Sequence, residues 1–251
     1  MGTSGVSGKA EAGAGERTLL ILPCFNEAGA IGGLLSEVQK VCPSHVTIVI
    51  DDCSTDQTSE IAGALSKVAR LSQNLGIGGA VQTGIRYARL QNFDFCIQID
   101  GDGQHRPDQI AKLFEAYRKQ PSNITIGSRY LDGQGFQSTL ARRMGARLIS
   151  WALKSAFGRT VTDPTSGMRM MDKTAIRFFA DHYPHDFPEP ISLARAFRNG
   201  FTVTEAPVVM RSREHGSSSI LGVKTLLYMI RVVSYIFIAR IERKRPTRSP
   251  A

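Results

Sequence analysis

Two carboxylates stand one residue apart, at Asp100 and Asp102, directly after the apolar run of residues 93–99. Asp and Gly are poor strand residues, so this pattern predicts a buried strand whose carboxyl end opens into a loop. Two acidic side chains placed so close together repel each other unless a cation lies between them. Oxygen ligands of this kind suit Mg²⁺ or Mn²⁺, although an acidic turn in solvent would show the same residues.

Short apolar runs alternate with segments of helical length along the chain. The expected strands are 18–23, 46–50, 93–99, 123–127 and 202–209, and the expected helices are roughly 27–40, 57–69, 79–89, 107–118 and 140–157. Continuous buried strands separated by helices indicate an α/β fold, in which helices flank a mainly parallel central sheet. We therefore expect one catalytic or binding domain over residues 18–219.

Polar residues follow four of the expected strands, in the segments 23–27, 51–56, 100–102 and 127–130. The carboxyl ends of parallel strands meet at one edge of a sheet, and ligands bind there. Each segment alone could instead begin a helix, and Asn26 and Asp56 suit an N-cap position. The coincidence of four such segments favours a site.

Five segments match, in order, the motifs of family 2 glycosyltransferases, and the chain resembles that family over residues 18–220. The segments are Pro23-x-x-Asn26-Glu27, Asp51-Asp52-x-Ser54-x-Asp56, Asn74-x-Gly76-x-Gly78, Asp100-x-Asp102 and Asp163-x-Thr165-Ser166-Gly167. The resemblance implies the GT-A fold, which binds nucleotide-sugars.

A narrower resemblance is to the polyprenyl-phosphate branch of the family, which includes dolichyl-phosphate mannose synthases and bacterial undecaprenyl-phosphate sugar transferases. It rests on Asp102-Gly103-Gln104-His105, Gly127-Ser128-Arg129-Tyr130, the run from Asp163 to Arg169, and Arg211-x-Arg213-x-x-Gly216-x-Ser218. Met168 departs from the Phe that is usual there, an exchange of one apolar residue for another.

The resemblance implies a role for each matching residue. The metal ligands would be Asp100, Asp102 and Gln104, with Mg²⁺ or Mn²⁺ as the cofactor. The nucleotide-sugar site would comprise Pro23, Asn26, Glu27, Asp52, Asn74, Gly76, Asp100, Gly101, Asp102, Arg213 and Ser218. The catalytic residues would be Asp102, Arg129, Asp163 and Arg213.

The implied reaction is inverting, metal-dependent transfer of a sugar from a nucleotide-sugar to a polyprenyl phosphate. A UDP-sugar is the favoured donor and GDP-mannose the second candidate. A diphosphate leaving group needs a metal and fixed cations, and arginine forks match phosphate oxygens. One alternative is a glycan hydroxyl as acceptor, with Glu189 as the catalytic carboxylate. The other is a membrane-associated, nucleotide-sugar-binding subunit without catalysis.

Positive charge is concentrated at the end of the chain. From Ile220 onward there are seven basic residues and one acid, in a protein of net charge +9. The segment 220–241 is apolar but interrupted by Lys224, Arg231 and Arg240. Its uncharged runs are therefore too short to span a membrane. It predicts an amphipathic helix that lies on an anionic membrane surface or packs on a membrane-spanning partner. Such an uneven distribution argues against a nucleic-acid partner.

We expect the protein in the cytoplasm, peripherally bound to the cytoplasmic face of the membrane. Four cysteines without metal-type spacing indicate reduced thiols. Residues 1–17 are rich in Gly, Ser and Ala and predict a disordered tail. Basic residues mixed with Leu148 and Trp151 in the expected helix 140–157 suit either lipid headgroups or an ordinary amphipathic helix. A homo-oligomer remains open.

Overall fold

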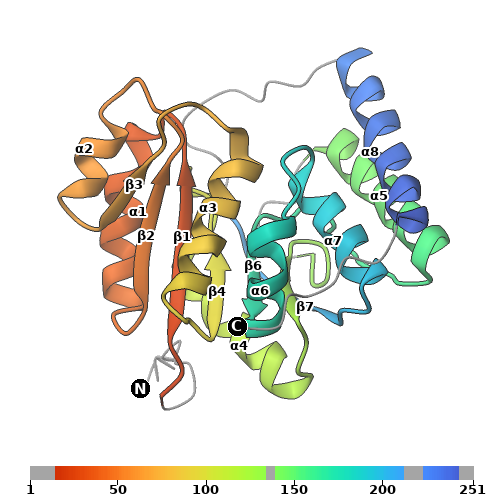
Figure 1. Ribbon diagram of the computed structural model, residues 1–251, viewed down its shortest axis with the longest axis horizontal. Coiled ribbons are helices and arrows are strands. Elements are labelled where there is room, and N and C mark those ends of the chain that lie inside the picture. Colours follow the sequence, from red (N-terminus) through yellow and green to blue (C-terminus); the bar gives the residue numbers. More distant parts are fainter. Residues whose placement is uncertain (1–14, 134–138, 212–222, 243–251) are drawn as a thin grey trace, which may run out of the picture.

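The computed structural model describes residues 15–133, 139–211 and 223–242, with side chains from 228 onward in the last segment. Its sheet has the order β3-β2-β1-β4-β6-β5-β7, and only β6 runs antiparallel to its neighbours (Figure 1). The strands are β1 (Thr18–Cys24), β2 (Val46–Asp51), β3 (Lys67–Arg70), β4 (Phe95–Gln98), β5 (Ile124–Ser128), β6 (Arg169–Asp172) and β7 (Val203–Pro207).

The helices cover both faces of this sheet, which confirms the predicted α/β fold. They are α1 (Ala28–Val41), α2 (Thr58–Gly63), α3 (Gly76–Leu90), α4 (Ile110–Lys119), α5 (Leu140–Phe157), α6 (Lys173–His182), α7 (Pro188–Arg198) and α8 (Val223–Ile241). A short 3₁₀ turn, Pro107–Gln109, precedes α4.

Strand β1 explains why the core has two parts. All of its residues are buried, and successive side chains of a strand point to opposite faces. Leu19 and Ile21 therefore join a cluster with residues of α3, α5, α6 and α7, whereas Leu20 and Leu22 join a cluster with residues of α1 and α4. Burial on both faces is what a continuous apolar run predicts for a parallel strand.

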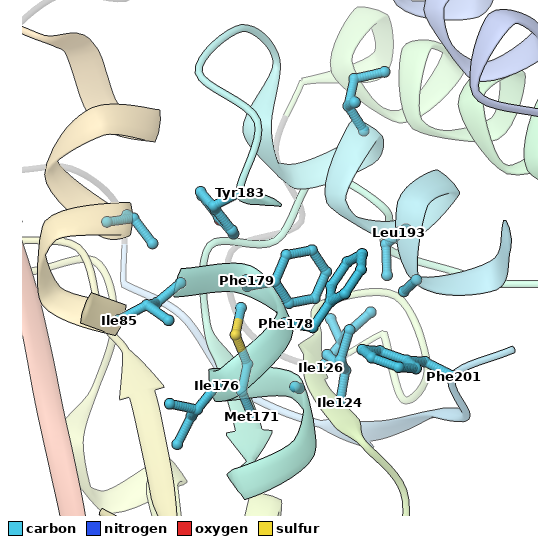
Figure 2. Close-up of a cluster of buried hydrophobic side chains, with 14 of the residues drawn as sticks. Ile85, Ile124, Ile126, Met171, Ile176, Phe178, Phe179, Tyr183, Leu193 and Phe201 are labelled. Carbon is cyan, nitrogen blue, oxygen red and sulfur yellow. The ribbon is translucent and has the colours of Figure 1, made fainter. Parts of the chain in front are cut away.

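Aromatic side chains fix α6 and α7 over the β5 side of the sheet (Figure 2). The ring of Phe178 packs edge-to-face on Phe179 and Phe201, with centroids 5.0 and 5.1 Å apart. Ile124, Ile126 and Leu193 belong to the same buried cluster. No element had been predicted for residues 169–198, and this cluster is what holds β6, α6 and α7 there.

Several predicted boundaries need correction. The expected helix 57–69 ends at Gly63, because Lys67–Arg70 pairs with β2 as the edge strand β3. The expected tail 1–17 ends too late, since Arg17 donates to Asp94 and to the Gln91 carbonyl and lies over the Phe93 ring. Helix α5 has the predicted bounds.

Helix α8 differs from the prediction in one respect. The sequence predicts a contact with a membrane surface or a membrane-spanning partner, yet Val232, Ile236 and Ala239 are buried against the rest of the molecule. Ile230 and Ile241 are exposed. None of the described helices combines the length and apolar character of a membrane span.

Candidate active site

The ends of β1, β2, β4 and β5 meet at one edge of the sheet. β1 pairs in parallel with β2 and β4, and β4 and β5 both run antiparallel to β6 between them. The four predicted polar segments therefore share this edge, called the strand-end edge below. The antiparallel β6 adds its preceding loop, residues 163–167, to the same side.

Carboxylates converge on Cys24 at the end of β1. The pKa of this buried thiol is raised, first by burial and then by the negative charges of Glu27, Asp51, Asp100 and Asp102. Negative charges from three separate strand ends act on this thiol, so carboxylates gather at the middle of the strand-end edge and make the potential there negative. Such a potential favours a bound cation.

The loop after β4 brings the expected metal ligands together. Asp102 Oδ1 accepts from the Gln104 backbone N–H at 3.0 Å, and the Gln104 side-chain amide donates to Asp102 Oδ2. Asp100 Oδ1 accepts from Gln98 at 3.2 Å. Turning the Gln104 amide over would present its oxygen beside the Asp102 carboxylate, so this donor set fits a hard divalent cation.

His105 holds the backbone of this loop. Its Nδ1 lies 2.8 Å from the Asp100 backbone N–H, which donates to it, so Nδ1 carries no proton. The 3.7 Å separation between Nδ1 and Asp100 Oδ2 is consequently not an ion pair. Within the described ranges no three His, Cys, Asp or Glu side chains form a metal-binding group, so a metal here depends on Asp100, Asp102 and the Gln104 amide.

Two glycines allow close packing around these carboxylates. A Cβ on Gly167 would lie 2.7 Å from Asp100 Oδ2, and a Cβ on Gly101 would lie 2.3 Å from Cys24 Sγ. A larger residue at Gly167 would displace the Asp100 carboxylate, and one at Gly101 would displace either Cys24 or the loop that carries Asp100 and Asp102.

Asp52 and Asn74 shape the entrance of α3. The buried Asp52 carboxylate accepts from the Leu75 N–H at 2.7 Å, and the Asn74 amide donates to the Asp52 carbonyl at 3.3 Å. The Gly76 N–H donates in turn to Asn74 Oδ1 at 3.1 Å, with Gly76 at φ 75°. One Asp52 oxygen is therefore used to fix the loop.

Asn26 does not cap α1, contrary to the expected alternative. It lies in the left-handed region at φ 56°, and its Oδ1 accepts from the Thr55 N–H at 2.8 Å. Asp56 accepts instead from the Ala28 N–H at 3.1 Å and the Thr58 N–H at 3.0 Å, at the starts of α1 and α2. These contacts tie together the loops that follow β1 and β2, where Pro23 is the buried penultimate residue of β1.

Arg129 and Asp163 form a forked ion pair on the other side of the edge. Arg129 Nε and Nη2 each lie 2.7 Å from an oxygen of the fully buried Asp163 carboxylate, and Nη2 also donates to Thr165 at 2.9 Å. Glu205 of β7 accepts from the Asp163 backbone N–H at 3.0 Å. Two of the four residues for which the resemblance implies a catalytic role are thus directly paired.

Arg169, the last residue of the motif run that begins at Asp163, is a buried cation for which the sequence predicted no role. Its guanidinium donates to the carbonyls of Pro164, Ser166 and Glu189 at 2.7–2.9 Å and to Ser192 Oγ at 2.8 Å. It joins the loop before β6 to the start of α7. An arginine directly before the apolar pair Met170-Met171 was the signal that could have revealed it.

Glu189, half-buried at the start of α7, is the residue proposed above for a hydroxyl acceptor. Burial raises its pKa, the positive charge of Arg169 opposes that shift, and Asp100 adds to it. These interactions place its carboxyl near the strand-end edge. Its pKa is shifted toward the range that suits a general base or acid.

The remaining arginine candidates have separate outcomes. Arg211 forms a fork with Glu37 of α1, with both distances 2.8 Å, so its guanidinium is held by that carboxylate. Arg213, Gly216 and Ser218 lie outside the described residues.

The family model described as glycosyl transferase family 2 matches residues 19–179. The protein belongs to this family. Two curated relatives are a polyprenol monophosphomannose synthase of Mycolicibacterium smegmatis, 27% identical over 96% of this chain and 98% of the relative, and a UDP-N-acetylglucosamine–dolichyl-phosphate N-acetylglucosaminyltransferase of Methanococcus voltae, 28% identical over 82% and 91%.

Among solved structures, the fold is similar to that of glucosyl-3-phosphoglycerate synthase from Mycobacterium tuberculosis in complex with Mn²⁺, UDP and phosphoglyceric acid. The TM-score is 0.72 at 18% identity, over 96% of this chain and 84% of the other. This likeness shows the GT-A fold and confirms that prediction.

Proposed function

We propose that the protein transfers a sugar from a nucleotide-sugar to a polyprenyl phosphate with inversion at the anomeric carbon. One observation carries the proposal: the strand-end edge places a cluster of carboxylates beside a fixed arginine. Family membership and the names of the relatives, which act on polyprenol or dolichyl phosphate, support it. The catalytic unit in this proposal is residues 18–219.

Asp100, Asp102 and Gln104 would hold Mg²⁺ or Mn²⁺. The metal would supply positive charge to neutralise the diphosphate as it leaves. Without it, the carboxylates around Cys24 would repel a nucleotide diphosphate. The negative potential of the edge therefore supports metal dependence.

The donor side comprises the loops after β1 and β2 and the entrance of α3. Pro23, Asn26, Glu27 and Asp52 would contact the nucleoside, with Asn74, Gly76 and Gly101 shaping the loops around it. The exposed side chains of Phe25 and Leu75 in these loops suit packing against a base. A UDP-sugar is the favoured donor, GDP-mannose is the second candidate, and Arg213 and Ser218 remain proposed donor contacts.

The acceptor side comprises Arg129 and Asp163. Asp163 would hold the Arg129 guanidinium so that it meets the acceptor phosphate. The second pKa of a phosphate monoester is about 6, so this nucleophile is already an anion near neutral pH and needs no strong base. The phosphate oxygen attacks the anomeric carbon, the bond to the nucleotide diphosphate breaks, and the product has the opposite anomeric configuration.

A glycan hydroxyl is the second candidate acceptor, and Glu189 is the observation that favours it. A hydroxyl nucleophile must lose a proton, and a half-buried carboxyl with a raised pKa could accept it. Loss of hydroxyl-directed transfer in Glu189→Gln would support this reading.

We also propose that the protein acts at the cytoplasmic face of the membrane, bound peripherally through residues 220–251. The acceptor would reside in that membrane. A small membrane-spanning partner is the alternative anchor.

The test is a transfer assay with purified protein, Mn²⁺ or Mg²⁺, undecaprenyl phosphate and a panel of radiolabelled nucleotide-sugars. We expect label from one donor to enter the organic phase only when both metal and lipid are present. Transfer only to a water-soluble glycan would contradict the lipid acceptor. Tight donor binding with no transfer to any acceptor would favour a non-catalytic subunit.

A further inference from the structure

Helix α5 is apolar on two opposite faces. Ala146, Ile149, Ala152, Leu153 and Ala156 are buried against the core, and Leu140, Met144, Leu148 and Trp151 are exposed. At about 100° per residue, the centres of these two stripes lie roughly 150° apart around the helix. A surface helix needs only the buried stripe to fold, so the exposed one calls for another explanation.

Helix α8 repeats this arrangement beside α5. Val232, Ile236 and Ala239 are buried, while Ile230, Phe237, Ile238 and Ile241 are exposed. The two helices pack together at Gly145 and Met229, where a Cβ on the glycine would lie 3.5 Å from the methionine sulfur.

The buried stripes of both helices belong to the same core cluster, and the exposed stripes lie on the opposite side of each helix. Both exposed stripes therefore face the same side of the pair and form one surface, the α5–α8 surface. It lies at the end of the molecule away from α2 and β3 (Figure 1). Of the sixteen exposed large apolar side chains in the described ranges, nine belong to these two helices, so the surface is a concentration rather than ordinary scatter.

The charges on this surface have one sign. Helices α5 and α8 contain no Asp or Glu, and their basic residues are Arg142, Arg143, Arg147, Lys154, Lys224, Arg231 and Arg240. On α5, Arg147 and Lys154 are exposed and border the apolar stripe. Trp151 adds an amphipathic ring, which favours a water–lipid boundary.

This composition selects among the occupants that could cover the surface. In a two-fold dimer the surface would meet its own copy, so basic residues would oppose basic residues with no acid on either helix to pair them. An anionic bilayer offers negative headgroups to the basic border and acyl chains to the apolar stripe at once.

We propose that the α5–α8 surface docks the protein on an anionic lipid bilayer, with Leu148, Trp151 and Phe237 in the apolar boundary and Arg147 and Lys154 at the headgroups. This rests on the proposed function only in that the acceptor is a membrane lipid. In this proposal the membrane contact is made by the packed pair α5 and α8, whose inner faces belong to the core, and not by the C-terminal helix alone. Docking then fixes the orientation of the catalytic domain.

The experiment is co-sedimentation of the full chain with phosphatidylcholine vesicles that contain or lack phosphatidylglycerol. The vesicles contain no polyprenyl phosphate, and no nucleotide-sugar is added. We expect binding to the anionic vesicles that weakens with salt. Leu148→Glu with Trp151→Glu lowers the partition coefficient at least about tenfold, and Arg147→Glu with Lys154→Glu lowers it about tenfold on anionic vesicles only.

Matched controls lie outside the surface. Leu90→Glu changes an exposed leucine of α3, and Lys40→Glu with Lys119→Glu makes the same change of net charge on α1 and α4. We expect both to bind like the wild type, and circular dichroism checks that every variant is folded. Wild-type binding by Leu148→Glu with Trp151→Glu, or equal binding to neutral and anionic vesicles, would overturn the proposal. So would a solution dimer that this variant dissociates.

Failure of docking and failure of the proposed reaction are distinguishable. Transfer in detergent to a short-chain polyprenyl phosphate does not require a bilayer, so docking variants should retain it. Docking without any transfer would remove the reaction and leave the surface assignment intact.

Discussion

The strand-end edge and the α5–α8 surface carry opposite charges in one small protein. At the edge, burial raises the pKa of Cys24, and the carboxylates of Glu27, Asp51, Asp100 and Asp102 raise it further. The two helices of the surface contain basic residues and no acid. In the proposed reaction both regions meet phosphates, so the difference implies two ways of binding them: through a recruited metal at the edge, and directly by side-chain cations elsewhere.

Arg129 combines features of both regions. It is a cation at the same edge, but a buried carboxylate holds it by two 2.7 Å hydrogen bonds. Fixed geometry suits recognition of one phosphate, whereas the exposed arginines and the lysine of α5 suit many headgroups.

The largest expected effect comes from removing a metal ligand. Asp102→Asn should lower transfer by at least about 100-fold, because the diphosphate would lose its neutralising cation. Initial rates at several Mn²⁺ concentrations measure this. Asp181→Asn, at an exposed residue that pairs with Arg89, is the control and should keep the wild-type rate. Equal rates for Asp102→Asn and the wild type would remove the metal assignment.

Substitutions in the Arg129–Asp163 pair should have the next largest effect. Arg129→Lys keeps the charge but loses the fork, so we expect transfer to fall about 10- to 100-fold, with most of the change in KM for the acceptor. Asp163→Ala leaves a mostly buried guanidinium without its carboxylate and should cost about 3–5 kcal/mol of unfolding free energy.

The fork between Arg211 and Glu37 is the matched surface pair. It is more exposed, so Glu37→Ala should cost less than about 1 kcal/mol in urea unfolding. Similar losses for Asp163→Ala and Glu37→Ala would mean that burial does not distinguish the two pairs.

Gly167→Ala tests how tightly the edge is packed. Its Cβ would lie 2.7 Å from Asp100 Oδ2, so the carboxylate must move. We expect about a tenfold loss of transfer with a raised Mn²⁺ requirement. Gly33→Ala, in α1 with open space around the glycine, is the control and should change neither. An unchanged Mn²⁺ requirement in Gly167→Ala would show that the loop absorbs the extra methyl group.

The smallest effect concerns stability and pH. Burial raises the pKa of Glu189, so the folded protein holds this proton more tightly than the unfolded chain does. As pH rises above the ordinary carboxyl pKa, the unfolded chain releases the proton first and the wild type loses stability. Glu189→Gln should therefore match the wild-type Tm in acid and exceed it by a few degrees at alkaline pH. A constant difference across the range would contradict the raised pKa.

The sequence predicted the parts of the fold that depend on long, regular patterns. Helix α5 has the predicted bounds, and the strands that carry the polar segments are present. Strand β3 was missed because its four residues have no apolar run and gain their structure from pairing with β2. β6 was missed because Arg169, a charged residue, occupies a fully buried position that only its four hydrogen-bond acceptors make tolerable.

The site was predictable as a set of residues but not as a network. Motif order indicated Asp100, Asp102, Arg129 and Asp163, yet nothing in the sequence showed that Asp163 binds Arg129 or that Asn26 fixes the loop after β2. Such contacts depend on residues that are far apart in the chain. The same limit applied to α8, whose inner face needs α5 and α7 to be buried.

The most direct test of the two ways of binding phosphate is calorimetric titration of a nucleoside diphosphate and of a short-chain polyprenyl phosphate, each with Mn²⁺ and with EDTA. We expect EDTA to weaken UDP or GDP binding by more than about 100-fold, while acceptor binding is unchanged and depends on Arg129. Nucleotide binding that survives EDTA, or acceptor binding that is lost with the metal, would contradict it.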